Sequence, residues 1–264
     1  MATPRLVAKI ESEGPTLRLA VLIDADNAQA SVIEGLLAEV ARFGEATVKR
    51  IYGDFTAPAS ASWKKVLQKY AIKPMQQFAY TTGKNATDSS LIIDAMDLLY
   101  SRKFDGFCLV TSDSDFTGLA MRMKEEGLVV FGFGEQKTPE AFRNACHKFV
   151  FTEVLRPPVK DDAVGVAKPV ALQKEVAATA SEPPTKPIPK AFLLDALAKS
   201  SDEHGWAHLG TFGSYLTKLQ PDFDSRTFGH RRLSDLVRAC SEFLVTEDRA
   251  VPGGSQKVTY IREK

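Results

Sequence analysis

The 264-residue chain has little of what would mark a secreted, thiolate-metal or membrane-spanning protein. Its three cysteines, Cys108, Cys146 and Cys240, lack the Cys-x-x-Cys spacing of a zinc or redox site. An odd count of this kind is typical of reduced core cysteines. No apolar run approaches the roughly 20 residues of a membrane helix, and the N-terminus has no signal-peptide core. We therefore expect a cytoplasmic protein with no membrane partner.

A strong charge of one sign is also missing. The chain has 34 basic and 33 acidic residues, so its formal net charge is +1. It therefore lacks the global basic field of many nucleic-acid binders, although a local basic patch is still compatible with this balance. The hydrophobic fraction of 44% and the charged fraction of 25% are those of a globular protein. The length is sufficient for two domains.

Hydrophobic patterning divides the chain into two modules. After a tail at 1–16, short apolar runs alternate with helical periodicity over 17–155. This alternation predicts an α/β domain with a mostly parallel sheet flanked by helices. Residues 156–189 contain seven prolines and no aromatic residue, which is typical of a flexible linker. Residues 190–264 show three helical segments and a hairpin, the plan of a small winged helix.

The expected elements of the two modules follow from the same patterns. In the first module we expect strands at 18–24, 46–53, 72–79, 106–111, 128–133 and 148–154. The helices expected there lie at 28–42, 60–70, 87–101, 115–126 and 138–144. In the second module we expect a first helix around 192–197, helices at 207–219 and 229–240, and strands at 243–246 and 257–261.

Aspartates lie at the ends of two apolar runs that should be buried strands. Asp24 ends the run 19–23, and Asp113 follows the run 107–112. In a doubly wound sheet, strands 18–24 and 106–111 lie side by side at the switch point, where ligands bind. Asp88 begins the helix at 87–101 and is expected over the same edge. Such a cluster needs a cation, and an oxygen-only site suits Mg²⁺ or Mn²⁺.

This arrangement predicts chemistry on phosphodiesters, because two divalent ions about 3.5–4 Å apart can activate a water and stabilise a leaving oxygen. Asp94 is a weaker metal candidate, since six residues rotate it by about 240° around the helix from Asp88. Asn27, Lys84 and Ser112 are the candidates for substrate binding. The predicted catalytic and metal-binding carboxylates are Asp24, Asp88, Asp113 and Asp115, with Asp94 as a further metal ligand. Asp115 taken alone also suits a helix N-cap.

Three motifs of the first module resemble one known family. They are Ile23-Asp24-Ala25-Asp26-Asn27, Lys84-Asn85-Ala86-Thr87-Asp88 with Asp94, and Thr111-Ser112-Asp113-Ser114-Asp115-Phe116. Across about 18–155 the chain resembles the NYN domain family, LabA-like proteins related to PIN and FLAP nucleases. The resemblance implies a PIN-like, Rossmann-like fold and metal-dependent RNA cleavage. It further implies that Asp24, Asp88 and Asp113 are the metal carboxylates, Asp115 a further acidic member and Asn27 the motif asparagine.

The second module resembles the LOTUS domain, also called OST-HTH, in segments 204–210 and 221–229. This resemblance implies a winged-helix fold and RNA binding, or a protein partner instead, as in some eukaryotic relatives. From the residues, 229–232 should open a helix and add cationic donors to its free N–H groups. Trp206 and Phe228 are expected in the core. The candidate RNA-binding residues are Lys218, Arg226, His230, Arg231 and Arg232.

Three alternatives to a ribonuclease share part of this pattern. A haloacid-dehalogenase-like phosphatase also has Asp-x-Asp after its first strand, but it needs Thr or Val where this chain has Ala28. A Toprim domain pairs Asp-x-Asp with a strand-end Glu, whereas this chain has Asp24. The stronger rival is a non-catalytic RNA-binding adaptor, which the near-neutral charge of both modules allows. The chain is thus expected to be a metal-dependent endoribonuclease with a targeting module. The sequence is compatible with a homodimer but does not decide the oligomeric state.

Overall fold

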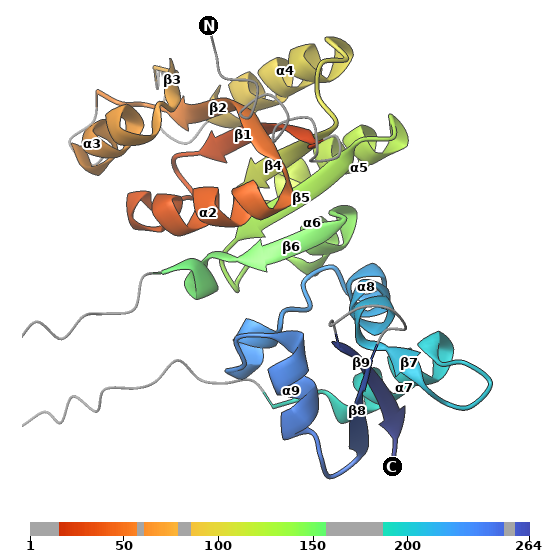
Figure 1. The fold of residues 1–264 in the computed structure, drawn as a ribbon. Helices are drawn as coiled ribbons and strands as arrows, with labels where there is room; N and C mark the ends of the chain where they lie inside the picture. The colour runs from red at the N-terminus through yellow and green to blue at the C-terminus, as the bar shows by residue number, and fades with distance from the viewer. Residues whose placement is uncertain (1–15, 57–60, 79–85, 157–186, 251–256) are drawn as a thin grey trace, which may run out of the picture. The chain divides into compact units, whose positions relative to one another are not determined.

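The structure, a computed structural model, describes residues 16–56, 61–78, 86–156, 187–250 and 257–264 (Figure 1). The described residues fall in two stretches of the chain, within 16–156 and within 187–264, which are described separately as the first and the second unit. Most of the predicted tail at 1–16 and of the predicted linker at 156–189 lies outside the described residues.

The described part of the first unit is built on a six-stranded parallel sheet in the order β3-β2-β1-β4-β5-β6. β1 therefore lies beside β4, as the sequence predicted, and the strand order reverses between them. The last residue pair of these two strands is Ile23 with Val110, so both strands end at the same edge of the sheet. The strands are β1 (Arg18–Asp24), β2 (Glu45–Gly53), β3 (Lys73–Gln76), β4 (Gly106–Val110), β5 (Val129–Gly134) and β6 (Lys148–Phe151).

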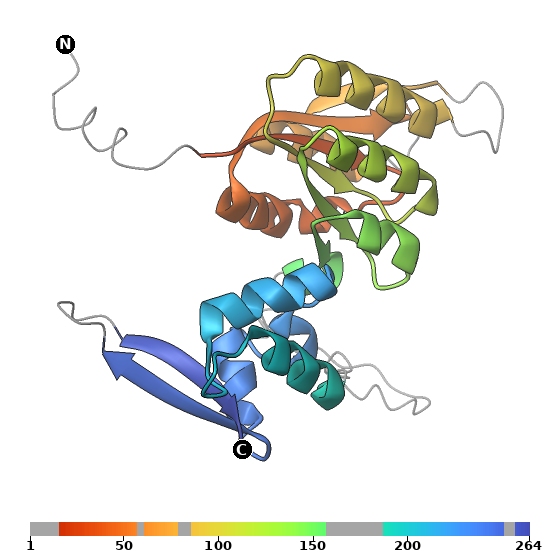
Figure 2. The ribbon, with the colours of Figure 1, turned by 90° about the vertical axis from the view of Figure 1, so that its right-hand side faces the viewer.

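Helices cover both faces of this sheet (Figure 2). On one face lie α4 (Ala86–Tyr100), α5 (Thr117–Glu125) and α6 (Glu140–Ala145). On the other face lie α2 (Ile33–Phe43) and α3 (Ala61–Tyr70). Short 3-10 turns complete the connections: η1 (Ala30–Val32), η3 (Ser114–Phe116) and η4 (Thr152–Leu155).

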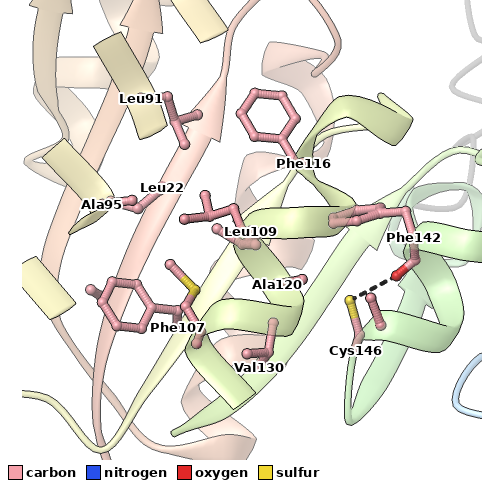
Figure 3. Packing of buried hydrophobic residues seen from close by; sticks show 14 of the residues in the cluster. Leu22, Leu91, Ala95, Phe107, Leu109, Phe116, Ala120, Val130, Phe142 and Cys146 are labelled. Carbon is pink, nitrogen blue, oxygen red and sulfur yellow. Dashed lines mark hydrogen bonds between the residues drawn. The ribbon is translucent and has the colours of Figure 1, made fainter. Parts of the chain in front are cut away.

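The core explains why the strands appear in the sequence as continuous apolar runs. Leu22 of β1 packs with Leu91 and Ala95 of α4 on one face of the sheet (Figure 3). Its neighbours Val21 and Ile23 pack against the opposite helices, and all three strand residues are fully buried. Since successive side chains of a strand point to opposite faces, a sheet covered on both sides needs apolar residues at every position. The three cysteines are buried and free, as expected.

The second unit has the arrangement of a winged helix, with helices packed on one small antiparallel sheet in the order β7-β9-β8. Its buried side chains include Leu193, Phe212, Leu236 and Ile261. The elements are α7 (Lys190–Ser200), β7 (Ala207–His208), α8 (Leu209–Leu219), η5 (Ser225–Phe228), α9 (Leu233–Ala239), β8 (Leu244–Ala250) and β9 (Lys257–Glu263).

Two of the expected helices of this unit begin later than the sequence suggested. Residues 207–208 pair with β9 as a short strand, so α8 starts only at Leu209. Gly229 has φ 81° and ends η5, so α9 starts at Leu233 rather than at 229. A left-handed residue of this kind stops helical hydrogen bonding. In the part of the chain that the structure describes, no helix is long and apolar enough to cross a membrane.

Candidate functional site

Asp24, the last residue of β1, is fully buried at the edge where β1 and β4 end. Its Oδ1 accepts a hydrogen bond from the Asp26 backbone N–H at 3.0 Å. Its Oδ2 accepts from Asn27 Nδ2 at 2.8 Å and from the Thr111 hydroxyl at 3.0 Å. Burial raises the pKa of Asp24 in spite of these bonds, which favour the ionised form. The carboxylate is therefore oriented but not neutralised by these three partners.

Thr111 connects Asp24 to Asp113. Its hydroxyl donates to Asp24 and accepts the Asp113 backbone N–H at 3.1 Å. Asp113 in turn caps η3, since its Oδ1 accepts the Asp115 N–H at 2.9 Å. The N-cap is thus Asp113 rather than Asp115, which lies in the first turn and is exposed. Sequence reasoning missed Thr111, although a hydroxyl residue that directly follows a buried strand was an available signal.

Asp88 lies in the first turn of α4, as predicted, and its pKa is raised to about 6. Burial is the largest cause, and the negative charges of Asp24 and Asp113 follow, with smaller contributions from Asp26 and Asp115. Charges act in this way only over short distances. The structure therefore brings the carboxylates of β1, α4 and the β4–η3 connection into one electrostatic group. Asp26, which sequence reasoning did not select, belongs to that field.

Asp94 has a different environment from this group. Its carboxylate forms an ion pair with Arg50 and accepts a hydrogen bond from the Tyr52 hydroxyl. Both partners lie on β2, so Asp94 ties helix α4 to the sheet. Burial and the Asp94 carboxylate raise the pKa of Tyr52, which stays protonated and donates. These contacts account for both oxygens of Asp94 and leave it a poor metal ligand.

The predicted substrate-binding residues fall in different places. Asn27 donates a hydrogen bond to Asp24 and so orients its carboxylate. Ser112 is buried, and its hydroxyl oxygen accepts the Glu135 N–H at 2.9 Å, which joins β4 to the end of β5. The backbones of Gly134 and Thr111 lie close together here, since a Cβ on Gly134 would lie 2.5 Å from the Thr111 carbonyl oxygen. Lys84 lies outside the described residues.

The predicted RNA-binding residues of the second unit are not equivalent in the structure. Arg226 binds Asp224 through Nε and a terminal nitrogen, the latter at 2.6 Å from Oδ2. Lys218, Arg231 and Arg232 are exposed, and His230 is half-buried. Because α9 begins at Leu233, residues 229–232 precede a seven-residue helix instead of forming its first turn. The anticipated phosphate site on a long helix N-terminus is therefore not formed.

The aromatic residues of the second unit also differ from expectation. Trp206 and Phe228 were expected in the core, and both are only partly buried. Trp206 comes directly before β7, at the border of the small sheet, and two arginine side chains lie over its ring. Phe228 ends η5, a segment without a buried residue.

The donor set of the first unit fits a hard divalent cation in its chemistry. It consists of carboxylates from three elements, and after burial the negative charges of Asp24 and Asp113 contribute to the raised pKa of Asp88. Among the described residues, however, no three His, Cys, Asp or Glu side chains already stand close enough to hold a metal ion. The site is thus one of clustered charge rather than a closed coordination shell.

Comparison with protein-family models gives two matches. The NYN domain model matches residues 18–154, and the OST-HTH/LOTUS domain model matches residues 186–253. The first match spans the parallel sheet with the acidic cluster, and the second spans the helices and β8 of the winged-helix unit. No curated protein is significantly similar to the chain.

Three solved structures are similar to parts of the chain. An uncharacterized protein from Nitrosomonas europaea is 50% identical, with a TM-score of 0.30, and the match covers 37% of this chain and 92% of that one. A protein of unknown function from Vibrio parahaemolyticus is 17% identical, with a TM-score of 0.45, over 57% of this chain and 98% of that one. A protein from Chromobacterium violaceum is 34% identical, with a TM-score of 0.24, over 31% and 87%.

Proposed function

The chain belongs to the NYN domain family, and we propose that it is a metal-dependent endoribonuclease targeted by its C-terminal OST-HTH/LOTUS domain. NYN domains belong to a nuclease superfamily, and OST-HTH/LOTUS domains bind RNA. The observation that carries the proposal is the place of Asp24, Asp88 and Asp113 at one edge of the sheet, where Asp24 and Asp113 are near enough for their charges to act on Asp88. Three separate elements deliver these acids to the switch point between β1 and β4, where α/β sheets bind their ligands.

Asp24, Asp88 and Asp113 are the proposed metal-holding residues, with Asp115 as a further acidic member. NYN and PIN-like nucleases generally use divalent metals, and Mg²⁺ or Mn²⁺ is the proposed ion here. Such an ion, when bound, supplies an activated water and stabilises the leaving oxygen of a phosphodiester. We leave Asp94 out of this set because Arg50 and Tyr52 use its oxygens.

The neighbouring residues have positioning roles in this proposal. Asn27 and Thr111 fix Oδ2 of Asp24 by two hydrogen bonds, which sets the orientation of the buried carboxylate. The Asp115 N–H fixes Oδ1 of Asp113 in the same way. Ser112 accepts one hydrogen bond through its oxygen, and its own O–H is the group proposed to contact a substrate. Lys84 is proposed as a phosphate contact on the strength of its motif alone.

In the second unit, Lys218, His230, Arg231 and Arg232 stay proposed contacts to the RNA backbone. Arg226 is the weakest of the original candidates, because Asp224 already occupies its guanidinium group. A protein partner of this domain and a homodimer of the chain also stay predictions. The expected basic contacts would position RNA without reading its sequence.

The test of the nuclease proposal is cleavage of a linear and a circular single-stranded RNA by the purified full chain. Cleavage should require Mg²⁺ or Mn²⁺ and stop with EDTA, and cutting of the circle would establish endonucleolytic action. The Asp113→Asn variant should lose activity yet keep its fold, because asparagine caps helices as well as aspartate does. Asp97→Asn, at an exposed position of α4, is the matched control and should retain activity.

One result would favour the rival function. If the wild-type chain binds RNA but cuts neither substrate with either metal, it acts as a non-catalytic RNA-binding adaptor. A chain that neither binds nor cuts RNA contradicts both functions.

A further inference from the structure

We propose that one face of the small sheet in the second unit binds single-stranded RNA by stacking unpaired bases. We call this the outer sheet face and define it by Trp206, Tyr260, Arg249 and Arg262. The proposal rests on the proposed RNA function, and it adds the binding surface and the state of the strand. It also places this binding away from the basic segment 229–232.

Strand alternation shows that these side chains share one face. Ile261 of β9 is fully buried and lies opposite Ala207, which is 1% exposed. Because successive strand residues point to opposite faces, Tyr260 and Arg262 point away from the buried side. Arg249 of β8 follows two residues after Glu247, the partner of Tyr260 in the ladder, and so joins them.

The aromatic rings and guanidinium groups of this face are in contact. The Arg249 Cζ lies 4.6 Å from the ring centroid of Trp206 and 4.6 Å from that of Tyr260. The Arg262 Cζ lies 4.8 Å from the Trp206 centroid. His208 extends the group, with its ring 5.7 Å from that of Tyr260. Unpaired bases stack on aromatic rings and on arginine planes, so these flat cationic surfaces match them.

Trp206 is held in place by its backbone. Its N–H donates to Asp202 Oδ1 at 2.9 Å, and its carbonyl oxygen accepts the Asp202 N–H at 2.8 Å. Gly205 has φ 75° in this turn, a conformation that other residues seldom adopt. The half-buried indole is thus held in one position while part of it stays accessible, and little conformational entropy remains to be lost on binding.

The charges of the outer sheet face suit a polyanion. Arg249 is paired with Glu247 at 3.1 Å, but Arg262 is exposed and forms no ion pair within the described part of the chain. Its guanidinium group is available to a phosphate beside the stacked base. In a duplex the bases already stack on one another and cannot reach the tryptophan, so the face should prefer an unpaired strand.

The test measures RNA binding by the full chain in EDTA, so that it does not depend on cleavage. The probes are a short fluorescein-labelled oligouridine and an RNA duplex of equal length. We expect the oligouridine to bind more tightly than the duplex. Trp206→Ala should weaken its binding by about tenfold or more, and Arg262→Gln by roughly fivefold. Arg238→Gln, at an exposed arginine of α9, is the matched control and should bind like the wild type.

A second measurement reports the contact itself. The chain has two tryptophans, and Trp63 is buried in the first unit, so a Trp63→Phe background leaves only Trp206 to fluoresce. Oligouridine should quench this emission at the concentrations that saturate anisotropy. Should Trp206→Ala fail to fold, the exposed Arg262 and the quenching still test the proposal.

Several results would overturn the proposed face. They are equal binding by wild type and Arg262→Gln, unchanged Trp206 emission on saturation, preference for the duplex, or no binding of RNA. The absence of RNA binding would instead favour a protein partner for the outer sheet face. None of them changes the outcome of the cleavage assay, so the nuclease proposal stands or fails separately.

Discussion

The Thr111 hydroxyl donates a hydrogen bond to Oδ2 of the buried Asp24, 87 residues earlier in the chain. The same hydroxyl accepts the Asp113 backbone N–H, so one side chain links the Asp24 carboxylate to the backbone of Asp113. This relationship exists because β1 and β4 are neighbours in the sheet. It makes Thr111 a positioning residue of the acidic cluster.

Replacing Thr111 by valine should therefore disturb both acids at once. Thr111→Val keeps the shape but leaves a buried carboxylate and a backbone N–H without this partner, which should cost about 1–3 kcal/mol. We expect lower stability in urea unfolding with EDTA and slower RNA cleavage with Mg²⁺ or Mn²⁺. Thr111→Ser keeps the hydroxyl and is the control that should recover most of both. Equal stability of the valine variant and the wild type would contradict this role.

Asn27 should stabilise the protein because its amide donates a hydrogen bond to the buried Asp24 carboxylate. Asn27→Asp has nearly the same shape, but it replaces the amide donor at 2.8 Å by a second carboxylate. The loss of this charged hydrogen bond should destabilise the metal-free protein by about 2 kcal/mol. Asp26→Asn, in contrast, removes an exposed negative charge near Asp24 and should leave stability unchanged or higher. Thermal unfolding of both variants in EDTA measures each change against the wild type, and only Asn27→Asp should lower the melting temperature.

Asp88 should make the metal-free protein less stable as the pH rises. The pKa of Asp88 is about 6 in the folded protein, above its ordinary 3.8, so the folded state binds this proton more tightly than the unfolded state. Between these values stability falls as pH rises, because unfolding then releases the proton. Asp88→Asn should be equal to the wild type near the ordinary pKa and more stable at neutral pH.

The size of this effect is reduced by the partial exposure of Asp88. After allowance for solvent screening we expect about 1 kcal/mol, which raises the melting temperature by a few degrees. Thermal unfolding in EDTA, from acidic to neutral pH, measures the difference between variant and wild type. A difference that shrinks as the pH rises would contradict the assignment. Added Mg²⁺ should stabilise the wild type more than the variant.

Replacing Asp94 by asparagine should change the stability of the metal-free protein in the opposite direction to Asp88→Asn, although both residues lie on α4. Asp94→Asn weakens the bonds to Arg50 and Tyr52, whose polar groups are mostly buried, and should destabilise the protein by about 2 kcal/mol. Its metal requirement should stay that of the wild type. Tyr52→Phe in a double-mutant cycle tests the link, since the two effects should not add. An Asp94→Asn variant that is more stable in EDTA would place this residue in the acidic cluster.

Much of the site could be predicted from the sequence because its aspartates follow patterned elements. A parallel strand buried on both faces must be apolar along its length, so an aspartate at its end is visible as an exception. This reasoning located Asp24 and Asp113, and the alternation of strands and helices placed their strands side by side. Asp88 followed from the start of a helix with a clear apolar face.

Other features depend on distances that no local pattern encodes. Thr111 differs from any strand-end threonine only because Asp24 lies across from it. Asp94 has helical spacing that allowed either a metal or a structural role, and its contacts with β2 decided for the structural one. The beginning of α9 depended on the left-handed conformation of Gly229, which a glycine permits but does not require.

The sequence by itself determined the α/β class of the first unit, the winged-helix plan of the second and the presence of an acidic cluster. These follow from hydrophobic periodicity and from the rule that neighbouring segments pack by burying apolar faces. The tertiary structure alone decided which atoms orient the carboxylates, and which face of the small sheet carries Trp206 with two arginines beside it. Such contacts join residues from separate elements, and their geometry is set only when the whole unit packs.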